Sequence, residues 1–395
     1  MEWKELQTLV KRKIGYGIVQ PGPSVQKGVP IIKVNNIISG LYDTKHLDKT
    51  TVENDAKYQR TKLKGGELIV TVVGTCGKTA IVPPQFVGCN LVRATCLIDI
   101  EDETICRWIK YYIDSPQGQA YINRNLNTTV QATLNVKNLN EMPIPFYSKE
   151  YTSNVVKILS SLDRKIELNN KINADLEEMA QAIFKNWFVD FEPFKDSKFV
   201  DSELGMIPEG WKVGTLEDIA EITMGQSPAG NSLNENREGM IFYQGSSDFG
   251  FRFPSIRVFT TEPKRLAVAN SVLFSVRAPV GDINVAKEEC CIGRGVASIK
   301  SKYGHDSYLF YAMKSLHKLF DSFDGEGTVF GSINKKTLSA IQILLPSDGI
   351  VEQFNNIASS FDDRIRSLSD ENSRLSLLRD TLLPRLMSGE LEVPE

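Results

Sequence analysis

The feature that most constrains the fold is a long amphipathic stretch that occurs twice, at about residues 151–189 and 350–387. In each copy apolar residues recur mostly every three or four positions, the spacing that places one apolar stripe along an α-helix. The second stripe repeats the first 199 residues later (365 − 166), so Ile166 corresponds to Ile365 and Asn173 to Asn372. A register shared together with its polar interruption indicates an internal duplication. The stripe residues are Leu162, Ile166, Asn173, Leu176, Met179 and Ile183, and then Phe361, Ile365, Asn372, Leu375, Leu378 and Leu382.

Each helix needs a partner for its stripe, and the other copy is the obvious candidate. At ~1.5 Å per residue, a helix of ~38 residues is longer than ~50 Å. Two equivalent units pack self-complementarily about a two-fold axis, which makes the helices antiparallel. Asn173 and Asn372 then either lie on a wet edge of the stripe or pair across the seam and fix its register.

Each helix follows a globular segment, so the order along the chain is domain, helix, domain, helix. The expected boundaries are residues 1–150, 151–204, 205–348 and 349–395. In the first domain, Leu68–Val73 is typical of a buried strand, 90–100 of a second strand, and Thr104–Asp114 of a helix. The second domain repeats this pattern of strands and helices more weakly. The sequence therefore predicts an α/β (α+β) fold with two globular domains, a long antiparallel coiled coil and pseudo-two-fold symmetry.

Composition indicates an ordinary soluble, cytoplasmic protein. No apolar run approaches the ~20 residues that span a bilayer, and the first residues lack the apolar core of a signal peptide. The six cysteines form no C-x-x-C pair, so neither a zinc site nor a disulfide framework is indicated. The net charge of −3 is unevenly divided: residues 1–150 carry +5, 151–206 carry −3, 207–347 carry 0 and 348–395 carry −5. Neutral to basic domains permit a surface that faces phosphates.

No catalytic motif emerges. The sequence GTCGKT at 74–79 lacks the first glycine of a phosphate-binding loop, because Val72 occupies that position. No Asn/Asp-Pro-Pro-Tyr/Phe motif of an adenine methyltransferase occurs, and the three histidines have no partner at metal or triad spacing. We therefore expect a non-catalytic chain with no metal and no bound cofactor.

Three stretches resemble a known family. Residues 178–194 read EMAQAIFKNWFVDFEPF, residues 205–228 read GMIPEGWKVGTLEDIAEITMGQSP, and residues 382–391 read LLPRLMSGEL. They resemble the helix ends and recognition-domain starts of specificity subunits of type I restriction–modification systems, and the likeness covers essentially the whole chain.

This resemblance implies that each target-recognition domain reads one half of a split double-stranded DNA target while the coiled coil sets the spacer. It also implies two methyltransferase subunits that use S-adenosylmethionine for DNA methylation, and restriction subunits that use ATP and Mg²⁺. The alternative from the residues alone is a coiled-coil adaptor whose end domains bind protein or glycan. The aromatic stretch at 187–194 either packs against the second domain or serves as a docking patch.

Candidate DNA-contacting residues are polar side chains in expected loops and strand ends. Asparagine and glutamine can pair with adenine and arginine with guanine in the major groove. The candidates are Lys11, Lys13, Lys33, Asn35, Asn36, Lys78, Thr129 and Gln131 in the first domain, and Gln226, Gln244, Ser246, Arg277, Arg294, Thr328 and Asn334 in the second.

Overall fold

The computed structural model describes residues 1–38, 41, 44, 46–127, 131–325 and 331–393. The chain forms two compact units, here called unit 1 (residues 1–168 and 370–395) and unit 2 (residues 169–369). The two long helices, α6 (Lys149–Phe188) and α11 (Asp348–Met387), each contribute to both units. Both are 40 residues long, and their first residues are 199 positions apart (348 − 149). The predicted pair of long helices is confirmed.

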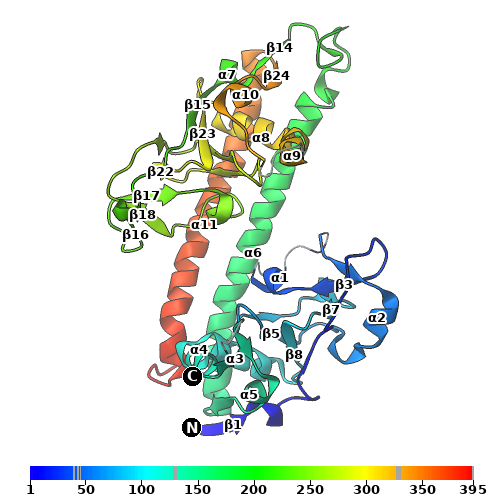
Figure 1. Ribbon diagram of the computed structural model, residues 1–395, viewed down its shortest axis with the longest axis vertical. Coiled ribbons are helices and arrows are strands. Elements are labelled where there is room, and N and C mark those ends of the chain that lie inside the picture. Colours follow the sequence, from blue (N-terminus) through cyan, green and yellow to red (C-terminus); the bar gives the residue numbers. More distant parts are fainter. Residues whose placement is uncertain (39–40, 42–43, 45, 128–130, 326–330, 394–395) are drawn as a thin grey trace. The chain divides into compact units, whose positions relative to one another are not determined.

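Unit 1 is a mixed α/β unit built on a four-stranded sheet of order β2-β8-β5-β6 and a three-stranded sheet of order β4-β3-β7. The strands are β1 (Glu2–Glu5), β2 (Gly15–Tyr16), β3 (Val29–Ile32), β4 (Lys49–Thr50), β5 (Leu68–Thr71), β6 (Thr79–Ile81), β7 (Asn90–Leu91), β8 (Thr95–Ile98), β9 (Leu126–Asn127), β10 (Thr133–Leu134) and β11 (Pro143–Phe146). The shorter helices are α1 (Val34–Ile38), α2 (Val52–Ala56), α3 (Glu103–Asp114), α4 (Pro116–Arg124) and α5 (Val136–Asn140). Figure 1 shows α3 and α4 of unit 1 beside the first half of α6.

Unit 2 repeats this plan. Its four-stranded sheet has the order β15-β23-β20-β21, and a five-stranded sheet has the order β16-β18-β17-β22-β19. The strands are β12 (Phe199–Val200), β13 (Ile207–Pro208), β14 (Lys212–Thr215), β15 (Ala220–Met224), β16 (Leu233–Asn234), β17 (Met240–Tyr243), β18 (Val258–Thr260), β19 (Leu266–Ala267), β20 (Val272–Ser275), β21 (Ile283–Val285), β22 (Cys290–Ile292), β23 (Val296–Ser301) and β24 (Gln342–Leu345). The shorter helices are α7 (Leu216–Ile219), α8 (Asp306–Ser315), α9 (His317–Gly325) and α10 (Lys335–Ser339).

The pairings of the strands match between the units, which confirms the expected echo. β5 lies between β8 and β6, as β20 lies between β23 and β21. The parallel pair β3–β7 corresponds to the parallel pair β17–β22, and the antiparallel pair β1–β11 to β14–β24. The two-fold relation between the units stays a prediction.

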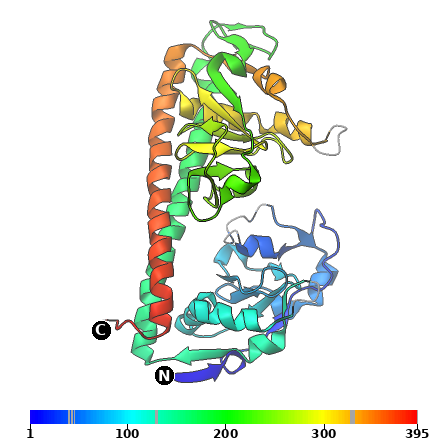
Figure 2. The same ribbon diagram turned by 60° about the vertical axis from the view of Figure 1, so that its left-hand side comes forward.

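In each unit one apolar core joins the four-stranded sheet to both long helices. The unit 1 core includes Trp108 of α3, Leu159 of α6 and Leu386 of α11. The unit 2 core includes Phe184 of α6 and Phe354 of α11, whose ring centroids are 5.5 Å apart. The first half of one helix therefore lies beside the second half of the other in either unit, so the helices are antiparallel there; Figure 2 shows this for the orange start of α11 and the green end of α6.

The buried face of the helices differs in part from the predicted stripe. Met179 and Leu378 are half exposed, at 51% and 46%, whereas Ala180 and Phe184 are buried. The prediction followed the large apolar side chains, but the close approach of the helix to its neighbours selects the small Ala180 one position later. Asn173 is buried, at 3% exposed. Its pairing with Asn372 stays a prediction, because the two residues belong to different units.

One aspartate on a long helix in each unit accepts a hydrogen bond from a tyrosine of the domain, and the two aspartates are equivalent. In unit 1, Asp163 of α6 accepts a hydrogen bond from Tyr111 Oη of α3 at 2.8 Å and pairs with Arg379 of α11 at 2.9 Å. In unit 2, Asp362 of α11, the residue 199 positions later (362 − 163), accepts from Tyr311 Oη of α8 at 3.0 Å. The duplication therefore repeats the helix and also the polar contact that holds its domain.

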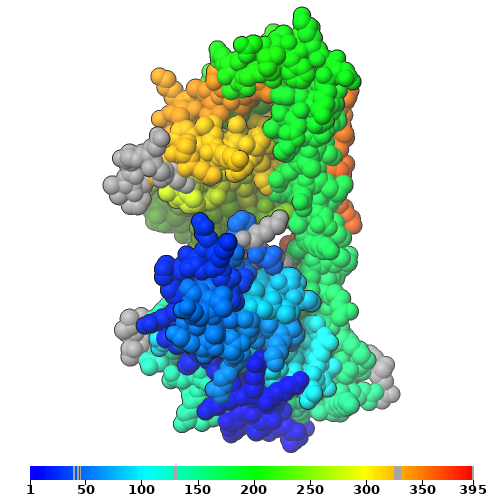
Figure 3. Space-filling model, turned by 90° about the vertical axis from the view of Figure 1, so that its right-hand side faces the viewer, coloured from blue at the N-terminus to red at the C-terminus, as the bar shows by residue number. Residues whose placement is uncertain are grey.

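In unit 2 the aspartate belongs to a larger buried network. Arg252 donates to Glu177 of α6 at 3.0 Å and to Asp362 of α11 at 2.6 Å, and Lys314 of α8 also pairs with Glu177. Figure 3 shows the yellow part of the second domain lying against the green surface of α6. The network ties a loop of the domain to both helices at once.

The aromatic stretch at 187–194 packs against unit 2, as the first of its two interpretations expects. Phe188 is buried, and its ring centroid lies 5.2 Å from that of Tyr308. Phe194 and Phe191 both contact Trp211, with centroids at 5.2 and 5.5 Å. These rings complete the core of the second domain.

Candidate nucleic-acid interface

In unit 1 the loops that follow several strands meet at one end of the two sheets. β3 and β7 run parallel and end at Ile32 and Leu91, and the turn at 92–94 then leads into β8. Val72, the residue after β5, donates to Ala94 O at 2.8 Å, which places the loop that follows β5 beside that turn. We call this region the unit 1 edge; it comprises residues 17–20, 33–36, 73–78, 92–94 and 131–133.

Unit 2 forms the same edge with the same backbone hydrogen bonds. Gly293 donates to Tyr243 O at 2.8 Å where Val92 donates to Ile32 O at 3.3 Å. Val276 donates to Gly295 O at 3.0 Å, the counterpart of the Val72–Ala94 bond. The unit 2 edge comprises residues 225–227, 244–248, 277–281, 293–295 and 331–334.

A glycine lets these loops approach closely in each unit. A Cβ at Gly17 would lie 2.2 Å from Leu91 O, and one at Gly225 would lie 2.1 Å from Gly293 O. Both distances are far below van der Waals contact with rigid backbone, so the first loop of each edge requires glycine at this position. The glycine is a packing requirement that holds the polar side chains of neighbouring loops together.

The unit 1 edge collects five of its eight sequence candidates, which are Lys33, Asn35, Asn36, Lys78 and Gln131. Lys11 and Lys13 lie elsewhere: Lys11 N–H donates to Asp99 O, beyond the other end of β8, and its ammonium pairs with Glu101 at 3.7 Å. Both residues stay DNA-contact candidates that lie away from the edge, because sequence proximity to the first strand does not say at which strand end a loop lies. Thr129 lies outside the described residues.

The unit 2 edge collects six of its seven candidates, which are Gln226, Gln244, Ser246, Arg277, Arg294 and Asn334. Ser227 Oγ donates to Gln244 Oε1 at 2.9 Å and accepts from Arg294 N–H at 3.3 Å, so three loops are linked by one hydroxyl. Asn334 has a structural role, since its side chain caps α10 by accepting from Thr337 N–H at 2.9 Å. Thr328 lies outside the described residues.

Sequence reasoning missed Arg93. A single strand was expected over 90–100, but β7 ends at Leu91 and β8 begins at Thr95, and Arg93 is exposed in the turn between them. A basic residue beside an alanine inside an otherwise apolar run was the available signal for this turn.

Exposed basic side chains outnumber exposed acidic ones on the loops of both edges, although the whole chain is slightly acidic. The segments of the unit 1 edge contain no Asp or Glu, and in the unit 2 edge Asp248 is buried and paired with Arg257 at 3.0 Å. Lys33 pairs with Asp48, and this hydrogen bond lowers the pKa of the Asp48 carboxyl. Lys78 and Arg93 in unit 1, and Arg277 and Arg294 in unit 2, are exposed and form no ion pair with any described residue. The loop that carries Arg277 also carries one exposed carboxylate, Asp282. Four exposed cations against that single carboxylate still suit a polyanionic ligand.

One cysteine, Cys76, lies within the unit 1 edge; it is half-buried, and burial raises the pKa of its thiol. Within the described ranges, no three residues of the types His, Cys, Asp and Glu are grouped to hold a metal ion. Cys96, close to the unit 1 edge, is buried, and burial raises the pKa of its thiol to about 12, so it stays protonated and unreactive. In the same described part of the chain, no helix combines the length and apolarity needed to cross a membrane.

The chain is similar to proteins of one known family. A family model described as "Type I restriction modification DNA specificity domain" matches twice, at residues 21–178 and 208–376. The chain is 31% identical over 383 residues to a putative type I restriction enzyme MjaX specificity subunit from Methanocaldococcus jannaschii, covering 93% of this chain and 88% of that protein. It is 26% identical to the type I restriction enzyme HindI specificity subunit from Haemophilus influenzae, covering 62% and 68%.

A solved structure shares the fold. The crystal structure of a type I restriction–modification system S subunit from M. genitalium superposes with a TM-score of 0.53 at 15% identity, covering 100% of this chain and 96% of that one.

Proposed function

Because this chain belongs to the type I restriction–modification DNA specificity family, we propose that it reads a split double-stranded DNA target without catalysing a reaction itself. Each edge contacts one half of the target, the unit 1 edge through its first-domain loops and the unit 2 edge through its second-domain loops. The observation that carries this proposal is the pair of equivalent edges, each with two exposed cations that form no ion pair with a described residue.

Different half-sites follow from the different side chains at equivalent positions. Lys33 in unit 1 stands where unit 2 has Gln244, since each follows a strand residue that accepts the same backbone hydrogen bond. An ammonium and a primary amide present different donors and acceptors to a base edge. The two domains therefore read different sequences with one framework.

The long helices act as the spacer between the half-sites in this proposal. At ~1.5 Å per residue a 40-residue helix is ~60 Å long, and each of the two helices enters both units. A paired helix is stiffer than a flexible linker, so it suits a fixed distance between half-sites. Two methyltransferase subunits, we propose, dock along these helices.

The chemistry belongs to the partners in this proposal. Methyltransferase subunits use S-adenosylmethionine, restriction subunits use ATP and Mg²⁺, and this chain binds none of these. Family membership disfavours the alternative of a coiled-coil adaptor for protein or glycan.

The test is to map methylated bases in DNA from a host that carries this chain and its modification subunits. We expect one split sequence, with the two half-sites separated by an invariant number of base pairs. Replacing residues 1–148 with the first domain of another family member should change one half-site and leave the other intact. A change in both half-sites, or methylation without a sequence rule, would contradict the proposal.

A further inference from the structure

Arg93 and Arg294 occupy the same turn in the two units. Each lies one residue after the residue that donates to the end of the parallel partner strand, namely Val92 to Ile32 O and Gly293 to Tyr243 O. Each also precedes a residue whose carbonyl accepts a backbone hydrogen bond, since Ala94 O accepts from Val72 N–H and Gly295 O from Val276 N–H. The two arginines are therefore equivalent by backbone hydrogen bonding.

The turn holds both arginines in a fixed backbone position. Arg93 N–H donates to Ile18 O at 2.8 Å, and Arg294 N–H donates to Ser227 Oγ at 3.3 Å. The residues on either side are bonded as well, since Thr95 donates to Val92 O at 3.0 Å and Gly295 to Gln244 O at 3.1 Å. Only the side chain of each arginine is left to act outward, and each is exposed without an ion pair among the described residues.

The side chains around the two arginines differ. Gln226 in unit 2 corresponds to Ile18 in unit 1, because each donates to the last residue of the parallel strand, Ile292 and Leu91 respectively. The next residues are Ser227 and Val19, so unit 2 has an amide and a hydroxyl where unit 1 has two apolar side chains. Both units therefore have an arginine at this position, but the side chains beside it differ between the units.

The two domains are proposed to read different sequences, yet both have an arginine at this position. A contact made by both domains is expected to be to a part of DNA that does not vary with sequence. Phosphates are that part, and contacts to them position a protein without carrying sequence information. Resting on the proposed function, we propose that Arg93 and Arg294 each bind a backbone phosphate in their half-site, and that the differing neighbours, Gln226 and Gln244 in unit 2, read the bases. The guanidinium group suits this role because its planar donors match two phosphate oxygens.

Salt dependence of binding separates a phosphate contact from a base contact. Each neutralised phosphate contributes about 0.9 to the slope of log K against log salt concentration on B-DNA. With the chain in complex with its modification subunits, we expect Arg93→Gln or Arg294→Gln to lower the slope by about 0.9, and the double variant by about 1.8. Binding should weaken by a similar factor for the mapped target and for an unrelated duplex of equal length, and the methylated sequence should not change.

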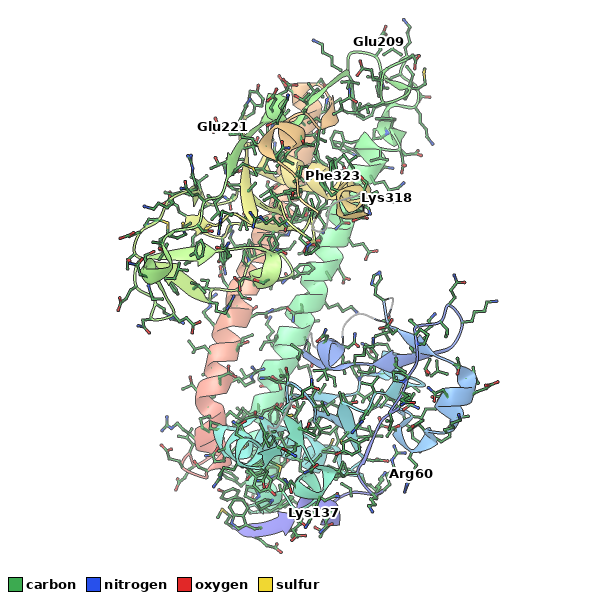
Figure 4. The ribbon with its side chains drawn as sticks, in the orientation of Figure 1. Arg60, Lys137, Glu209, Glu221, Lys318 and Phe323 are labelled. Carbon is green, nitrogen blue, oxygen red and sulfur yellow. The ribbon has the colours of Figure 1, made fainter. Side chains whose placement is uncertain are left out.

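Three further variants complete the test. Arg294→Lys keeps the charge, so its salt slope should stay close to that of the wild type. Gln244→Ala should alter base preference in the second half-site and leave the slope unchanged. Arg60→Gln is the matched control, because Arg60 is an exposed arginine of unit 1 outside the edge, on the short helix at 59–61 (Figure 4).

An unchanged slope in Arg93→Gln and Arg294→Gln would overturn the proposal, as would a changed methylated base in either variant. Because both side chains are exposed and unpaired, these variants should unfold at the wild-type temperature, which excludes misfolding as the cause of a loss. The proposed function fails by a different result: a wild-type complex that binds the mapped target and the unrelated duplex equally. The slope can still be measured in that case, so the two failures are distinguishable.

Discussion

Replacing Arg252 with methionine tests the buried network that holds the second domain on both helices. The Arg252 side chain is only 3% exposed, and its guanidinium carbon lies 4.1 Å from the centroid of the Phe310 ring. Burial opposes its charge, but Asp362, Tyr311 and Glu177 together raise its pKa, so the cation persists at any pH at which the protein is folded. Methionine keeps the apolar stem and removes the charge.

The magnitude follows from what is left behind. Breaking a buried ion pair by removing one partner costs about 3–5 kcal/mol, because the other charge remains buried. Glu177 retains Lys314 and Asp362 retains the Tyr311 hydroxyl, so we expect the lower end, about 3 kcal/mol. For a unit of this size that corresponds to a fall of roughly 6–12 °C in the unfolding temperature.

Hydrogen exchange locates the effect. Amides of α8 in unit 2 should exchange faster in Arg252→Met, while amides of α3 in unit 1 keep their wild-type rates. Adding Asp362→Leu should recover part of the lost stability, because the uncompensated carboxylate disappears. As the matched control, Arg379→Met in unit 1 should cost only about 1 kcal/mol, since that side chain is 30% exposed and its partner Asp163 keeps Tyr111. Stability of Arg252→Met within 1 kcal/mol of wild type, or no recovery in the double variant, would refute the reasoning.

Three other predictions use the helices, the edge and the thiols. Inserting four residues between Asn169 and Asn173 adds ~6 Å of helix, so methylation mapping should show the same half-sites with a spacer longer by one or two base pairs and lower activity; an unchanged spacer with full activity would disprove the ruler. Gly225→Ala should destabilise unit 2 by about 1–3 kcal/mol in thermal unfolding and impair reading of the second half-site, whereas Gly230→Ala, whose Cβ would meet open space, should do neither. Cys96 should resist alkylation at pH 8 in the native chain and react once it is unfolded, because burial raises its pKa to about 12; labelling of the native thiol, read by mass spectrometry, would contradict this.

The sequence by itself determined the long helices and the order of the domains. Helix periodicity is local, and a shared register at an offset of 199 residues identifies all four ends of the two helices to within two residues. The buried strand at Leu68–Thr71 and the helix at Glu103–Asp114 were equally readable, because each carries its own pattern. Loop composition also supplied most of the polar residues that the edges collect.

Only the tertiary structure decided which of those residues lie together. The edges are assembled by hydrogen bonds between segments far apart in the chain, such as Gly293 N–H to Tyr243 O, and no local pattern records such a pairing. The same reason explains why Lys11 lies away from the edge and why Arg93 was missed. The turn after β7 is held by two such bonds, from Val92 N–H to Ile32 O and from Val72 N–H to Ala94 O. Packing likewise decided the buried face of α6, where the small Ala180 lies inside and the larger Met179 lies at the surface.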